Sequence, residues 1–89
     1  MPKKRRKLNK LFEKQIYSSK KQVELTLAKI YDINDEDIQK DYMNSFGNIV
    51  YLFDQLKSHY DLSGFNDESE VLLNNYQTAF IKFGEEFEI

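Results

Sequence analysis

The feature that most limits the fold of this chain is a helical pattern that runs without interruption from Asn34 to Asp61. Large apolar residues recur along it at alternating spacings of four and three, which places them on one face of a helix: Tyr42, Phe46, Ile49, Phe53, Leu56 and Tyr60. A helix over residues 35–61 is about 40 Å long, at about 1.5 Å per residue. Gly64 is the expected helix stop.

The composition also favours helices. The 89 residues include three Gly and a single Pro, whereas a sheet sandwich needs turn residues about every 8–12 positions. There is no Cys, which excludes disulfides and thiolate metal sites and favours an intracellular context. No apolar run reaches the roughly 18–20 residues that a membrane span needs. The sequence therefore predicts one all-α domain.

Two shorter helices are expected on either side of the long one. Ser19 followed by Gln22 is a capping box, which predicts a helix over 20–31. Asn34 can cap the long helix, whose first turn is acidic, as the helix dipole favours.

The last third of the chain allows two interpretations. In the first, residues 62–70 form a loop, residues 71–73 form a short extended run, and the last helix covers 75–84. In the second, the last helix begins at Asp67, and Glu70 closes a capping box there. The pattern alone does not choose between them.

The charge of the chain is divided between its two parts. Residues 1–21 hold nine Lys and Arg against one Glu, a net charge of +8, whereas residues 22–89 hold four Lys against fourteen acids, a net charge of −10. We therefore expect a basic N-terminal tail over 1–18, in which residues 8–17 can form a turn or two of helix, and a folded domain over 19–89.

The basic tail predicts contact with a polyanion. Five consecutive cations at residues 3–7 can neutralise phosphates and release counterions. Residues 2–7 also match a nuclear import signal, and the plainer alternative is a solubilising tail. The expected nucleic-acid-binding residues are Lys3, Lys4, Arg5, Arg6, Lys7, Lys10, Lys14, Lys20 and Lys21.

No catalytic or metal-binding cluster is predicted, so we expect no enzyme and no cofactor. His59 is the only His and has no evident orienting partner, so we expect it to be exposed or to cap a helix. Residues 32–37 resemble a calcium loop, but Asp37 stands where Gly is required and Met43 where a bidentate Glu is required. Residues 27–33 resemble a helix-turn-helix, but the next helix opens with acidic residues that phosphates would repel.

The centre of the long helix predicts a protein partner. Residues 49–53 are five consecutive apolar residues and cover the whole circumference of a helix, so they must be enclosed on all sides. The flanking helices are expected to be too short for that, and Gly47 would allow a second backbone to cross closely. The expected partner interface is Tyr42, Phe46, Ile49, Val50, Phe53, Leu56, Tyr60, Leu72 and Phe80.

The expected order of elements over residues 20–84 resembles the histone fold. The order is a short helix, a tight loop, a long helix and a second loop. Residues 71–80 follow and look like the strand, cap and last helix of a histone-fold subunit. Short histone-fold chains with a basic tail resemble the centromere protein W family. That resemblance implies a non-enzymatic subunit that pairs with another histone-fold chain, similar to centromere protein T, within a larger inner-kinetochore complex on nuclear, centromeric DNA.

By this resemblance Lys20 and Lys21 would lie near the DNA backbone. The loops that face DNA in histones are acidic here, for example at residues 35–37, so the tail and the partner are expected to carry the DNA contact. Two alternatives remain: a self-contained helical adaptor or inhibitor of a protein target, such as a phage might encode, and a small ribosome-associated protein whose tail binds rRNA.

Overall fold

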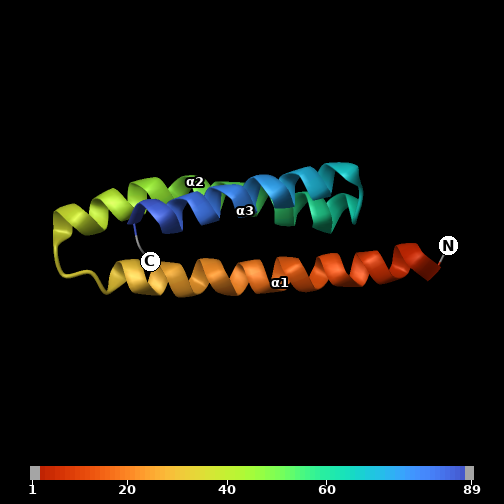
Figure 1. Ribbon diagram of the computed structural model, residues 1–89, viewed down its shortest axis with the longest axis horizontal. Coiled ribbons are helices and arrows are strands. Elements are labelled where there is room, and N and C mark those ends of the chain that lie inside the picture. The colour runs from red at the N-terminus through yellow and green to blue at the C-terminus, as the bar shows by residue number, and fades with distance from the viewer. Residues whose placement is uncertain (1–2, 88–89) are drawn as a thin grey trace.

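The computed structural model describes residues 3–87, with side chains from residue 9 onward. Within this range the chain forms three α-helices: α1 (Lys3–Tyr31), α2 (Glu36–Ser63) and α3 (Asp67–Phe87) (Figure 1). The predicted all-α class is confirmed. Short connections make neighbouring helices antiparallel, so the molecule is a rod of 53 × 21 × 17 Å.

Each helix turns one stripe of residues toward the other two. The stripes repeat at alternating spacings of four and three, and this 3.5-residue period keeps a seam facing its neighbours. Buried or half-buried stripe residues are Phe12, Ile16, Ser19, Val23, Thr26 and Ile30 in α1, Tyr42, Phe46, Ile49, Phe53, Leu56 and Tyr60 in α2, and Ser69, Leu73, Tyr76, Phe80, Phe83 and Phe87 in α3.

The first helix is far longer than the sequence suggested, with 29 residues in one continuous element. The expected boundary between residues 18 and 19 falls inside it, so the prediction that Ser19 caps a helix is wrong. Ser19 is only 4% exposed, and its carbonyl accepts a hydrogen bond from the Tyr76 hydroxyl at 3.2 Å. No Gly or Pro interrupts α1, and Phe12 and Ile16 extend its buried stripe toward the N-terminus. Residues 1–2 of the expected tail lie outside the described range.

The second helix matches its predicted position closely. Asp35 caps it instead of Asn34, since its carboxylate accepts the backbone N–H groups of Asp37 and Ile38 at 3.0 and 3.1 Å. Gly64 ends it at φ 72°, where Gly is favoured, and donates its N–H to the Tyr60 carbonyl. The predicted stop is confirmed.

The third helix begins at Asp67, which confirms the second of the two interpretations. Residues 71–73 are helical, so the predicted extended run is wrong, and α3 continues beyond residue 84. The capping box joins Asn66 and Ser69 rather than involving Glu70: the Asn66 side chain accepts the Ser69 N–H at 2.9 Å, and the Ser69 hydroxyl accepts the Asn66 N–H at 2.7 Å.

The chain covers the apolar stripe of its own central helix, and this stripe includes four residues that were expected to face a partner. Phe46, Ile49, Phe53 and Leu56 are between 0 and 6% exposed within the single chain, so they form its own core. The reason is that α1 and α3, with 29 and 21 residues, are long enough to cover α2. Five other expected interface residues are half-buried against the same core: Tyr42, Val50, Tyr60, Leu72 and Phe80.

The sequence predicted that residues 49–53 are enclosed on all sides. Within the single chain they are not. Tyr51 points away from the bundle and is 60% exposed. At Gly47 a β-carbon would meet no atom of the described residues within 4 Å, so no other part of the described chain crosses closely there.

Candidate nucleic-acid interface

The outward face of α1 carries a straight row of exposed residues that we call the lysine stripe: Lys10, Lys14, Tyr17 and Lys21. They are spaced four, three and four apart, like the buried stripe. Lys14 lies two residues, or about 200°, around the helix from the buried Phe12. The stripe therefore faces solvent and is about 16 Å long. In the sequence the same spacing continues through Lys7 and Lys3.

Aromatic contacts fix the N-terminal half of α1 to the rest of the bundle. The buried ring of Phe12 lies 5.6 Å from the Tyr60 ring and 5.0 Å from the Phe65 ring, measured between centroids. The Tyr60 hydroxyl donates to the Asn9 side chain at 3.3 Å. From there α1 continues past the turn between α2 and α3, so its red N-terminal end projects beyond the body (Figure 1).

The nine expected nucleic-acid-binding residues lie in three different places on α1. Lys10, Lys14 and Lys21 share the lysine stripe, and the five cations at residues 3–7 lie on the projecting helix, where only the backbone is described. Lys20 is turned toward α2. The basic segment is thus carried by a helix instead of a loose tail.

Lys20 borders a pocket of about 200 Å³ between α1 and α2, which we call the Tyr17 pocket. Its wall includes Tyr17 and Glu13 from α1 and Tyr60 and Asp61 from α2. Burial raises the pKa of Tyr60, and the nearby carboxylates of Glu13 and Asp61 raise that pKa further. The Tyr60 hydroxyl therefore stays protonated at neutral pH.

One candidate residue of this surface was not predicted from the sequence, namely Tyr17. Its side chain is 61% exposed in the middle of the lysine stripe, and the Lys21 ammonium lies 5.0 Å from the centre of its ring. The signal was the regular spacing from Lys10 to Lys21. That spacing forms a row only if the whole segment is one helix, whereas the sequence predicted a helix over 20–31.

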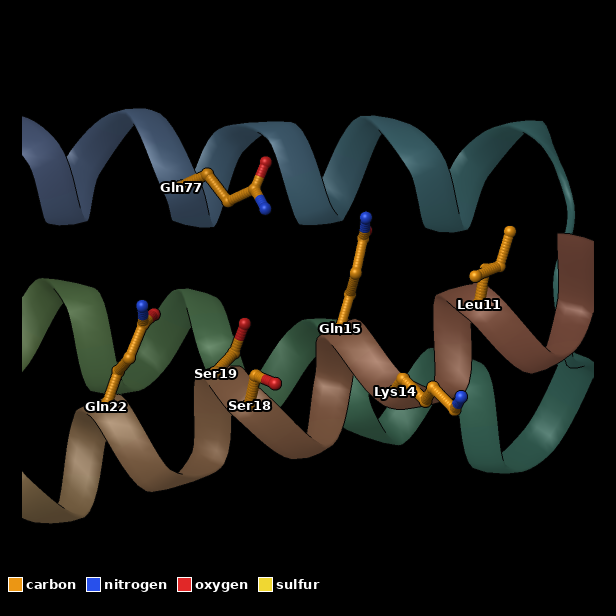
Figure 2. A pocket seen from close by; sticks show the side chains of 7 residues that line it. All are labelled: Leu11, Lys14, Gln15, Ser18, Ser19, Gln22 and Gln77. Carbon is orange, nitrogen blue, oxygen red and sulfur yellow. The ribbon is translucent and has the colours of Figure 1, made fainter.

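A polar groove of about 240 Å³ separates α1 from α3 beside the stripe. Figure 2 shows Gln15 and Gln22 on α1 and Gln77 on α3 along its two walls. Lys14 lies at its edge. These uncharged amides bound the lysine stripe on the α3 side, so the stripe is a narrow band of positive charge.

Acidic residues gather at the end of the rod opposite the projecting part of α1. The Tyr42 hydroxyl donates to the Phe87 carbonyl at 3.0 Å, which places the start of α2 beside the end of α3. Residues 35–37 and the exposed Glu85 and Glu86 therefore share this end. A polyanion would be repelled there and attracted to α1.

His59 supports the turn between α2 and α3. It is half-buried, and its Nε2 lies 3.0 Å from the Asn66 side-chain oxygen that caps α3. In contrast to the prediction from the sequence, His59 is therefore neither exposed nor itself a helix cap, but contacts the side chain that caps α3.

Within residues 3–87 no three or more His, Cys, Asp or Glu side chains are close enough together to hold a metal ion. None of the described helices is long and apolar enough to cross a membrane. Comparisons with protein-family models, curated proteins and solved structures find no match for this chain. The surface of α1 is therefore the candidate interface of this chain.

Proposed function

We propose that the chain is a non-enzymatic, self-contained helical bundle that binds the phosphate backbone of a nucleic acid through α1. The observation that carries this proposal is the lysine stripe, which occupies the face of α1 that the bundle leaves free. Lysines in a row neutralise phosphates and release counterions, which gives affinity without sequence preference.

The burial of α1 favours nucleic acid over a membrane surface as the polyanion. A helix that lies on a bilayer inserts an apolar face among the lipids. The apolar face of α1 is already occupied, since Phe12, Ile16 and Val23 are at most 7% exposed in the core. Lipid insertion would require α1 to leave the bundle, whereas contact with phosphates requires no rearrangement.

The test is the salt dependence of binding to a short labelled DNA duplex, measured by fluorescence anisotropy. The variant Lys10→Gln/Lys14→Gln removes two charges from the stripe. The slope of log K against log[salt] is negative, and its magnitude should decrease by about 0.9 per lost contact, or about 1.8 in total. The matched control Lys40→Gln/Lys82→Gln removes two exposed charges from α2 and α3 and should keep the original slope. Equal slopes in the two variants would contradict the proposal.

The histone-fold pairing suggested by the sequence is the second candidate. Its support is that α2, the helix that would cross a partner, leaves Tyr51 and Ile38 60% and 47% exposed. The length of α1 favours the first candidate, because it lets the chain cover its own core. Co-purification followed by mass spectrometry tests the pairing, which requires a histone-fold chain similar to centromere protein T among the captured proteins.

A further inference from the structure

We propose that Tyr17 stacks on an unpaired base beside the Tyr17 pocket, so that the lysine stripe binds single-stranded nucleic acid in preference to duplex. This inference rests on the proposed function and names its ligand more closely. It concerns the α1–α2 side of the stripe, where the described residues bring an exposed aromatic ring, a pocket and several cations together.

The position of Tyr17 is the first argument. Its ring lies between Lys14 and Lys21 along the stripe and is 61% exposed, although a tyrosine ring has much apolar surface to cover. Grooves that bind single strands combine cations that follow the backbone with aromatic side chains that stack on successive bases. Lys21 over the ring adds a cation to the same platform, at 5.0 Å from the centroid.

The pocket beside Tyr17 is the second argument. It contains a second aromatic ring, that of Tyr60, and its volume of about 200 Å³ offers room for a flat ring. Its charges balance, since its lining contains Lys20 and Glu13 as well as Lys57, which pairs with Asp61 at 3.0 Å. A balanced pocket attracts phosphate poorly but offers donors and acceptors to the edge of a base. The phosphates would then lie on the stripe and the base beside the pocket.

A duplex cannot use this arrangement. Its bases are stacked on each other, so it offers α1 only its phosphates and leaves the Tyr17 ring in water. A single strand offers both phosphates and free base faces. We therefore expect the chain to bind a single strand more tightly than a duplex. This difference in affinity should depend on Tyr17 and not on the total charge.

The direct probe is the variant Tyr17→Trp in a chain that otherwise contains no Trp. Stacking on a base should quench its fluorescence when a thymidine oligonucleotide is added, and a duplex of equal length should quench it less. The matched control is Tyr51→Trp on α2, because Tyr51 is 60% exposed but lies outside the stripe. Its fluorescence should not respond to either nucleic acid.

Binding measurements complete the test. Tyr17→Leu should weaken single-strand binding by about fivefold or more and leave duplex binding unchanged, whereas Tyr17→Phe should keep both. Circular dichroism checks that each variant keeps its helices. If Tyr17→Leu weakens binding of both forms equally or of neither, or if Tyr17→Trp is not quenched by the oligonucleotide, the inference is overturned, while the salt slopes of the Lys10/Lys14 variant still decide the proposed function. If the chain binds neither form even at low salt, both fail.

Discussion

Tyr76 is the residue that ties α3 to α1. It is fully buried, its hydroxyl donates to the Ser19 carbonyl at 3.2 Å, and its ring lies 5.6 Å from that of Phe53 on α2. Burial raises the pKa of Tyr76 to about 12, while the Ser19 side chain partly opposes that shift. One side chain thus contacts all three helices.

Replacing Tyr76 by Phe removes only this hydrogen bond. We expect Tyr76→Phe to lower the free energy of unfolding by about 0.5–1.5 kcal/mol at neutral pH, since a typical buried hydrogen bond contributes about that much. Urea unfolding measures the difference. Tyr51→Phe is the matched control, since that hydroxyl is exposed and should matter little. An unchanged midpoint for Tyr76→Phe would contradict the assigned contact.

The same residue predicts a loss of stability at alkaline pH. The pKa of Tyr76 is 10.0 without the fold and about 12 within it, so the unfolded chain releases the proton first as the pH rises. The contribution of the neutral hydroxyl is therefore complete below pH 10 and is lost as the pH rises toward about 12. The stability difference between the wild type and Tyr76→Phe should narrow over that window in urea unfolding. A constant difference would contradict the raised pKa.

At the scale of helices, the sequence predicted α2 well because its signals are local. Its apolar stripe, the acidic first turn and the stop at Gly64 all lie within the helix or next to it. The start of α1 could not be predicted in this way. Its contacts come from residues about 50 positions away, where Tyr60 and Phe65 hold Phe12, and the Ser19–Gln22 pattern suggested a false start.

The third helix illustrates the same limit. Residues 71–73 are apolar and partly β-branched, which favours an extended run when they are considered alone. Leu73 lies four residues after Ser69 and three before Tyr76 on one buried stripe, and packing against α2 overrides the local preference. The cap at Asn66 was missed because Ser69 rather than Glu completes its box.

Phe12 should control the order of the N-terminal half of α1. The variant Phe12→Ala empties a site that is 4% exposed and should lower the free energy of unfolding by about 3–5 kcal/mol. Amide hydrogen exchange should accelerate around residues 9–16 more than around residues 23–30. Uniform acceleration along α1 would show that Phe12 does not act as a local anchor.

Gly47 offers a test of a crossing partner. It lies within α2 with open space around it, so Gly47→Ala should stabilise the isolated chain by about 0.5–1 kcal/mol in urea unfolding. A lower stability would contradict the open environment. If a partner backbone crosses there, as the histone-fold candidate requires, the same variant would weaken capture of that partner.

At the scale of the molecule, the sequence predicted that the charge is divided between a basic and an acidic part. It did not predict how the basic residues are arranged in space. The nine N-terminal cations could be counted, yet their arrangement as a stripe depends on α1 being one helix from Lys3 to Tyr31. Tyr17 became a candidate for base stacking only through that arrangement. Four residues of the expected partner interface lie in the chain's own core for the related reason that the same helix packs against α2.

The claim on which the account depends is that this chain buries its own core without a partner. Light scattering on the purified protein, combined with thermal unfolding, tests it most directly. The account predicts a monodisperse particle of 10.7 kDa that unfolds in one cooperative transition. A larger self-associated species, or a monomer without a cooperative transition, would contradict the account and favour an obligate pair.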